Sequence, residues 1–107
     1  MNPDPYKYFR VEARDLVEEL GKGMLALETD AAAPGRVAQV QRLAHTLKGA
    51  ARVVKQGAIA DHAHALEEAL APHRAPGDSV PRARVDAVLG LLERIGIQVA
   101  SLDLPVA

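Results

Sequence analysis

Apolar residues recur along this chain at steps of three and four, which is the spacing of one face of an α-helix. The pattern falls into four stretches, and none of them alternates apolar and polar residues as a half-buried strand would. The sequence therefore predicts an all-α fold of four amphipathic helices. Their apolar stripes are Phe9, Ala13, Leu16, Leu20, Met24 and Leu27; Val40, Leu43, Leu47, Ala50 and Val54; Ile59, Ala63, Leu66 and Leu70; and Val85, Val88, Leu92, Ile95, Val99 and Leu102.

Residues that favour helix ends place the first two helices. Asp4 can cap the first helix, with Pro5 at the first helical position, where a missing N–H has no consequence. This helix should end near Thr29, before a loop over residues 30–35. We expect the second helix over about residues 36–55.

Glycine and proline mark the limits of the other two helices. Gly57 interrupts the second stripe, and we expect a third helix over about residues 58–70. Asp78 or Ser79 can cap the fourth helix, and Pro105 would end it. The loop between these two helices is marked by Pro72, Pro76 and Gly77.

Four helices of about 13–25 residues with short connections predict an antiparallel, up-down four-helix bundle. A chain of 107 residues is long enough for one domain with an ordinary core. We expect residues 1–102 to form that domain. Residues 103–107 would begin a linker to the rest of a longer protein.

Composition excludes several classes of function. Apolar residues make up 49% and charged residues 25%, as in an ordinary soluble domain, and the formal net charge of −1 argues against nucleic-acid binding. The chain has no cysteine, which excludes disulfides, thiolate catalysis and cysteine zinc sites and fits a cytoplasmic location. No apolar run approaches the roughly 20 residues of a membrane span, so we expect no membrane partner.

One histidine lies on the polar face of the second predicted helix. At about 100° per residue, His45 lies about 160–200° from the two leucines that flank it in the apolar stripe. Gly49 and Arg52 lie within about 40° of His45, and Lys48 within about 60°. A structural histidine needs neither a neighbouring cation nor an empty side-chain position. A histidine that receives a phosphoryl group from a bulky partner protein would use both.

The residues around His45 carry a family resemblance. The segment from His45 to Ala51 reads His-Thr-Leu-Lys-Gly-Ala-Ala, which resembles the signature of the histidine-containing phosphotransfer (Hpt) domain. That signature is a histidine, any residue, an aliphatic residue, lysine, glycine and two small residues. The first predicted helix resembles that of the N-terminal P1 domain of CheA-type chemotaxis histidine kinases, through the segments Phe9–Ala13 and Leu25–Glu28.

The third predicted helix adds to this resemblance. His64-Ala65-Leu66-Glu67 is similar to the His-x-x-Glu of the CheA-type subgroup, with Glu67 standing 22 residues after His45. The resemblance covers about residues 8–70, and the fourth helix matches only in kind. The chain departs from the family at Lys55, where a glycine is common, because its own glycine follows two residues later. The second helix is therefore expected to run longer than in the family.

The resemblance implies a role for each residue of the motif. His45 would be the phosphorylated nucleophile, since an imidazole that is neutral at cellular pH offers a lone pair on one nitrogen. Glu67 would accept the hydrogen bond from Nδ1–H and leave Nε2 free to react. Lys48 would balance the charge of the phosphoryl group. Gly49 would give a partner steric access, although glycine in a helix interior is unfavourable by about 1 kcal/mol relative to alanine.

Three further residues would extend the site. His64 would line the same site. Arg52 and Lys55 would extend a basic stripe that docks on an acidic response-regulator pocket. A metal site is not expected, because two of the four histidines, His62 and His64, point in different directions on their helix and no histidine pair is spaced four apart.

The implied function is that of a phosphocarrier in a two-component, chemotaxis-like system, and not of an enzyme by itself. A CheA-type ATP-binding kinase domain, expected in the same parent protein, would phosphorylate His45, and a response-regulator receiver domain would accept the group on an aspartate. No cofactor is expected on this domain; ATP and Mg²⁺ would be on the kinase domain and Mg²⁺ on the regulator. We expect the isolated domain to be a monomer. The alternatives are a free-standing Hpt phosphorelay protein and a helical adaptor that is not phosphorylated.

Overall fold

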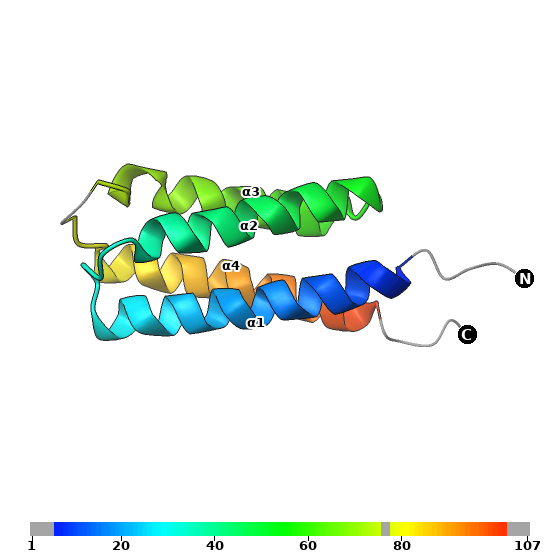
Figure 1. Ribbon diagram of the computed structural model, residues 1–107, viewed down its shortest axis with the longest axis horizontal. Helices are drawn as coiled ribbons and strands as arrows, with labels where there is room; N and C mark the ends of the chain where they lie inside the picture. The colour runs from blue at the N-terminus through cyan, green and yellow to red at the C-terminus, as the bar shows by residue number, and fades with distance from the viewer. Residues whose placement is uncertain (1–5, 76–77, 103–107) are drawn as a thin grey trace, which may run out of the picture.

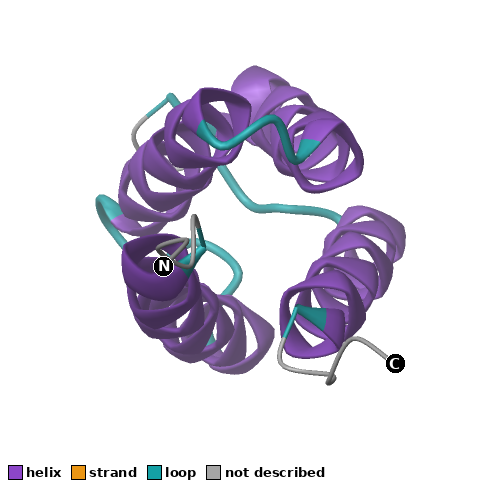
Figure 2. Cartoon of the chain, turned by 90° about the vertical axis from the view of Figure 1, so that its right-hand side faces the viewer, coloured by secondary structure: helices purple, strands orange, loops and turns teal. Residues whose placement is uncertain are grey.

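Four helices and one short 3₁₀ helix account for most of the computed structural model, which describes residues 6–75 and 78–102. Each helix runs opposite to the one before it, and no strand occurs in the described part of the chain (Figure 1). Seen end-on, the four helices surround a common core (Figure 2). The predicted all-α, up-down four-helix bundle is therefore confirmed. The elements are α1 (Lys7–Thr29), α2 (Arg36–Val53), α3 (Gly57–Leu70), η1 (Ala71–His73) and α4 (Arg82–Ser101).

The apolar stripes of three helices form the core as predicted. Every predicted stripe residue of α3 is buried, and those of α1 and α4 are buried except Leu16 and Leu102, which pack against the core from its edge. In the described structure α2 lies between α1 and α3, and α4 closes the ring against the same two helices. The site described below lies on the outer side of the α2–α3 pair.

The predicted stripe of α2 is confirmed at Val40 and Leu47, but the centre of the buried face is rotated toward the alanines of the helix. Ala44 and Ala51 are fully buried, whereas Leu43, Ala50 and Val54 are only partly buried. Small residues face α1 and α3 because α2 packs closely against both helices. The prediction missed these positions because alanine contributes little to a hydrophobic pattern. The close approach is visible at Gly23 of α1, where an added Cβ would lie 2.7 Å from a methyl group of Val40.

The turn after α2 shows why the chain can dispense with a glycine there. The helix ends at Val53, slightly before the predicted end near Lys55. Lys55 has φ 60°, in the left-handed region that normally favours glycine. The Gln56 N–H donates to the Ala51 carbonyl at 2.8 Å, and the Lys55 N–H donates to the Arg52 carbonyl at 3.1 Å. These two bonds form a Schellman motif, with Lys55 at the left-handed position that most often carries glycine in this motif.

The start of α4 also differs from the prediction. The helix begins at Arg82 after Pro81, and neither Asp78 nor Ser79 caps it. The preceding Val80 is buried, and its N–H donates to the Ala31 carbonyl at 3.1 Å, so this segment packs against the α1–α2 loop instead of starting a helix. The expectations for Asp4, Pro5, Pro76, Gly77, Pro105 and the 103–107 linker lie outside the described residues.

Candidate functional site

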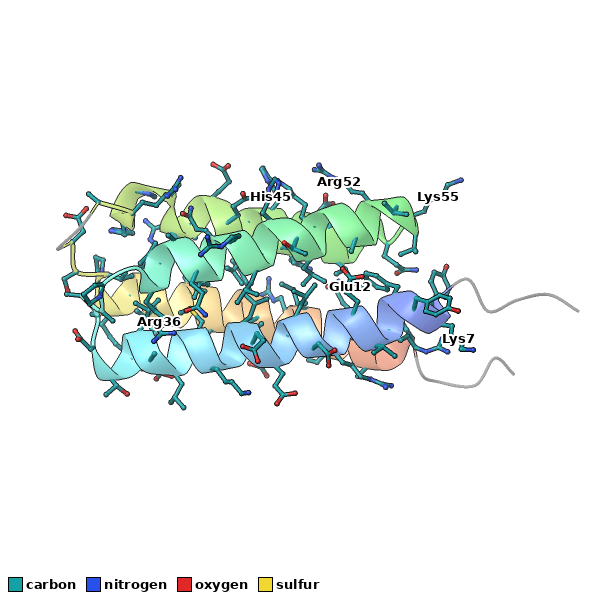
Figure 3. All side chains as sticks on the ribbon, viewed as in Figure 1. Lys7, Glu12, Arg36, His45, Arg52 and Lys55 are labelled. Carbon is teal, nitrogen blue, oxygen red and sulfur yellow. The ribbon has the colours of Figure 1, made fainter. Side chains whose placement is uncertain are left out.

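His45 lies on the outer face of α2, as the helical geometry predicts. Its side chain is 65% exposed, while Ala44 and Leu47 on the same helix are buried. Figure 3 shows His45 on the side of the bundle formed by α2 and α3, with Arg52 and Lys55 further along the same edge. The imidazole is therefore accessible to a large partner.

Glu67 of α3 holds the ring of His45. Its Oε2 lies 3.0 Å from His45 Nδ1. An ionised carboxylate only accepts hydrogen bonds, so the Nδ1 atom carries the proton of this bond. The contact fixes one tautomer and leaves Nε2, on the opposite edge of the ring, as the nitrogen with the free lone pair.

Lys48 binds the other oxygen of the same carboxylate. Its ammonium donates to Glu67 Oε1 at 2.8 Å, and the side chain is only 12% exposed. Lys48 also lies 3.5 Å from Nδ1 of His64, which can accept a hydrogen bond from it. Lys48 is thus directed first at Glu67, and His64 lies at the edge of the same network.

The charges around Glu67 set its ionisation. Burial raises the pKa of this carboxyl, but the hydrogen bonds and positive charge from Lys48, with a further contribution from His45, outweigh burial and lower the pKa below its ordinary value. Glu67 is therefore a carboxylate throughout the physiological pH range. A full negative charge faces the Nδ1 side of the imidazole.

Gln41 fixes the backbone that carries Glu67, and sequence reasoning missed it. Its Nε2 donates to the Glu67 carbonyl at 2.9 Å. Near the end of α3, the Ala71 N–H bonds to the Glu68 carbonyl three residues back, which turns the chain into η1. Gln41 comes one turn before His45 and shares a helix face with the apolar residues Val37 and Ala44, so a polar residue at that spacing is the signal that could have identified it.

A hollow of about 260 Å³ opens beside His45. It is absent from the sequence-based predictions because Arg74, which contributes to it, follows η1 and lies far from His45 along the chain. Neither Arg52 nor Lys55 belongs to it. The residues that line the hollow are Ala38, Gln41, Arg42, His45, Glu67 and Arg74.

Gly49 leaves open space on the other side of His45. A Cβ built at Gly49 would have no heavy atom within 4 Å, apart from its own helix backbone. The glycine also borders a groove between α1 and α2 whose lining includes Tyr8, Glu12 and Val53. Packing within this domain therefore gives no reason for glycine at this position.

The described residues contain neither a cluster of metal ligands nor a membrane-spanning helix. No group of three or more histidine, cysteine, aspartate or glutamate side chains in residues 6–75 and 78–102 is placed to hold a metal ion. Within the same ranges, no helix is long and apolar enough to cross a membrane.

Comparison with known proteins identifies the family. A model of the Hpt domain matches residues 6–97, which include α1, α2, α3 and most of α4. The chain belongs to the Hpt domain family. The sequence resemblance described above ended near residue 70, whereas the family model continues to residue 97. Most of α4 is therefore part of the shared domain.

A curated relative points to the same subgroup as the sequence. The chemotaxis protein CheA of Treponema pallidum (strain Nichols) is 35% identical over 94 residues, which cover 88% of this chain and 12% of that protein. The chain thus spans about one-eighth of the length of this relative. No solved structure matches the chain. The predicted resemblance to Hpt and CheA domains is confirmed, and the chain is a phosphotransfer domain of two-component signalling.

Proposed function

We propose that His45 is the phosphorylated residue of this domain, accepting a phosphoryl group from ATP through a CheA-type kinase domain and passing it to a response-regulator aspartate. One observation carries the proposal: an exposed imidazole whose Nδ1 is held by a carboxylate at 3.0 Å, so that Nε2 is the reactive nitrogen. The carboxylate is held in turn by Lys48 at 2.8 Å, and its backbone by Gln41.

The reaction needs no acid or base other than this pair. The Nε2 lone pair attacks the γ-phosphorus of ATP, the Nε2–P bond forms, and the P–O bond to the β-phosphate breaks with its electron pair leaving on ADP. The Nδ1 proton stays between His45 and Glu67, and the carboxylate stabilises the positive charge that develops on the ring. In the second step a regulator carboxylate attacks phosphorus, and the electron pair of the Nε2–P bond returns to the imidazole. Positioning and charge supply most of the catalysis in such transfers.

The other motif residues have supporting roles in this proposal. Lys48 keeps Glu67 ionised and oriented, and its positive charge also balances the phosphoryl group from the Glu67 side of the ring. Gly49 gives the partner room to close over His45. His64 lines the edge of the network, and Arg52 and Lys55 are exposed cations available to an acidic regulator surface.

The proposed setting follows from the CheA relative. The domain would be the phosphotransfer part of a longer cytoplasmic histidine kinase that controls motility, with ATP and Mg²⁺ bound by the kinase domain and Mg²⁺ by the regulator. A free-standing phosphorelay protein would use the same chemistry at His45. The isolated domain is expected to be a monomer, because a partner must have free access to the face that bears His45.

The experiment combines the domain with the CheA-type kinase domain, labelled ATP and three variants. His45→Gln should abolish acceptance of the label. Glu67→Gln keeps the side-chain shape but loses the charge, and should slow phosphorylation by about tenfold or more. Glu68→Gln, at an adjacent and more exposed carboxyl, is the matched control and should react like wild type. If His45→Gln accepts the label at the wild-type rate, the proposal is wrong and the alternative of an adaptor that is not phosphorylated on His45 remains. If Glu67→Gln and Glu68→Gln are phosphorylated at equal rates, Glu67 does not orient His45.

A further inference from the structure

The motif lysine already has a counter-ion. Lys48 is mostly buried and donates to Glu67 Oε1 at 2.8 Å, so much of its charge serves a carboxylate that is present before any phosphoryl group arrives. A phosphoryl group on His45 brings one to two further negative charges. It would be attached to Nε2, on the edge of the ring that faces away from Glu67. Positive charge is needed on that edge.

Two arginines are among the residues that line the hollow beside His45. Arg42 precedes His45 by one helical turn, and side chains on a helix lean toward its N-terminus, so the imidazole leans toward the turn of Arg42 and away from Gly49. Arg74 comes to the same hollow from the segment after η1. The hollow has a volume of about 260 Å³. A water molecule needs about 30 Å³, so the hollow is large enough for a phosphoryl group and several waters.

Both guanidinium groups are available for a new anion. Within residues 6–75 and 78–102, neither Arg42 nor Arg74 has a side-chain hydrogen bond or ion pair, whereas Arg82 pairs with Asp86 at 2.9 Å. Guanidinium binds phosphoryl oxygens through two parallel hydrogen bonds. Gln41, which is 8% exposed and also lines the hollow, has a buried Oε1 without a partner in the described structure. That oxygen can accept from one guanidinium N–H and leave the others for the phosphoryl group.

We propose that Arg42 and Arg74 form a phosphoryl-binding pocket that holds the group on His45 Nε2 after transfer. The proposal rests on the proposed function of His45 and adds the residues that bind the product. The arginines form no covalent bond; they neutralise the phosphoryl oxygens and orient the phosphorus for the next transfer. Glu67, held by Lys48, binds Nδ1 and also lines the hollow, and the two arginines on the rest of its wall supply the positive charge for the phosphoryl group.

The test uses ³¹P NMR on the domain phosphorylated with phosphoramidate, a small donor that needs no partner protein. The double variant Arg42→Gln/Arg74→Gln removes both charges at exposed positions, and Arg84→Gln, on α4 away from the hollow, is the matched control. The midpoint at which the phosphoryl group takes up a proton should rise by roughly one to one and a half units in the double variant, as expected for the loss of two unit charges about 4–6 Å away in water. Arg84→Gln should leave the midpoint unchanged, and Arg42→Lys/Arg74→Lys should restore most of the shift.

The outcomes separate this inference from the proposed function. If wild-type His45 takes up no phosphoryl group, the proposed function fails. If His45 is phosphorylated but the double variant and Arg84→Gln have the wild-type midpoint, the function stands and the arginine pocket is wrong. A raised midpoint in the double variant alone, together with a severalfold slower uptake from phosphoramidate, would support the pocket. Thermal unfolding of the unphosphorylated variants checks that each is folded.

Discussion

Replacing Gly49 with alanine should stabilise the domain and yet slow its reactions with protein partners. The stability part follows from the open surface, because a Cβ at Gly49 meets no atom within 4 Å. In a helix interior alanine is favoured over glycine by about 1 kcal/mol. For a domain of this size that gain corresponds to a melting temperature higher by about 4–8 °C, which differential scanning fluorimetry or calorimetry would measure.

The functional part follows from the position of the new methyl group. It lies within about 40° of His45 around the helix, on the face that a partner's active site must cover. Phosphoramidate is small enough to pass this methyl group, whereas a kinase domain closing over His45 is not. The uptake rate from phosphoramidate should therefore be unchanged, and the rate with the kinase domain and ATP should fall severalfold.

Gly21→Ala is the matched control for this experiment. Gly21 lies in α1, and an added Cβ there also meets no atom within 4 Å. The control should gain similar stability and react normally with both donors. The steric argument is refuted if Gly49→Ala reacts with the kinase domain as fast as wild type. A fall in the rate with both donors would instead show that the methyl group disturbs His45 itself.

Three further predictions test the packing, the turn and the charges. Gly23→Ala should destabilise the domain by about 1–3 kcal/mol in urea titration, because its Cβ would lie 2.7 Å from Val40, and a gain in stability would contradict the close approach of α1 and α2. Lys55→Gly should stabilise the domain by about 0.5–1 kcal/mol. Glycine relieves the strain of the left-handed conformation, and the greater freedom of the unfolded chain offsets part of that gain. A loss of stability would contradict the positive φ of Lys55. Because the pKa of Glu67 is lowered in the folded domain, its stabilising effect is complete above the ordinary glutamate pKa and is lost as pH falls through the lower folded value. The stability difference between wild type and Glu67→Gln should therefore shrink on acidification in this window, and a pH-independent difference would rule this out.

Much of the site could be predicted from the sequence because its signals are local. His45, Lys48 and Gly49 lie within two turns of one helix, and their outward position follows from the phase of the apolar stripe. The contact of Glu67 with His45 was expected from the family spacing, and the structure gives it a distance of 3.0 Å. Arg42, three residues before His45, could have been found by the same helical geometry.

Other features depend on packing between distant segments, which periodicity does not report. The buried face of α2 was misplaced because its centre is formed by alanines. The cap at Asp78 or Ser79 was wrong because Val80 is buried against the α1–α2 loop. Arg74 joins the hollow only through the path of the chain after α3.

The most direct test of the central claim locates the phosphoryl group itself. The purified domain would be treated with phosphoramidate, and the modified residue identified by intact-protein and peptide mass spectrometry at neutral to basic pH. The account predicts one phosphoryl group, labile in acid and stable in base, on His45 alone among the four histidines. Equal modification of all four histidines, or none at His45, would contradict it.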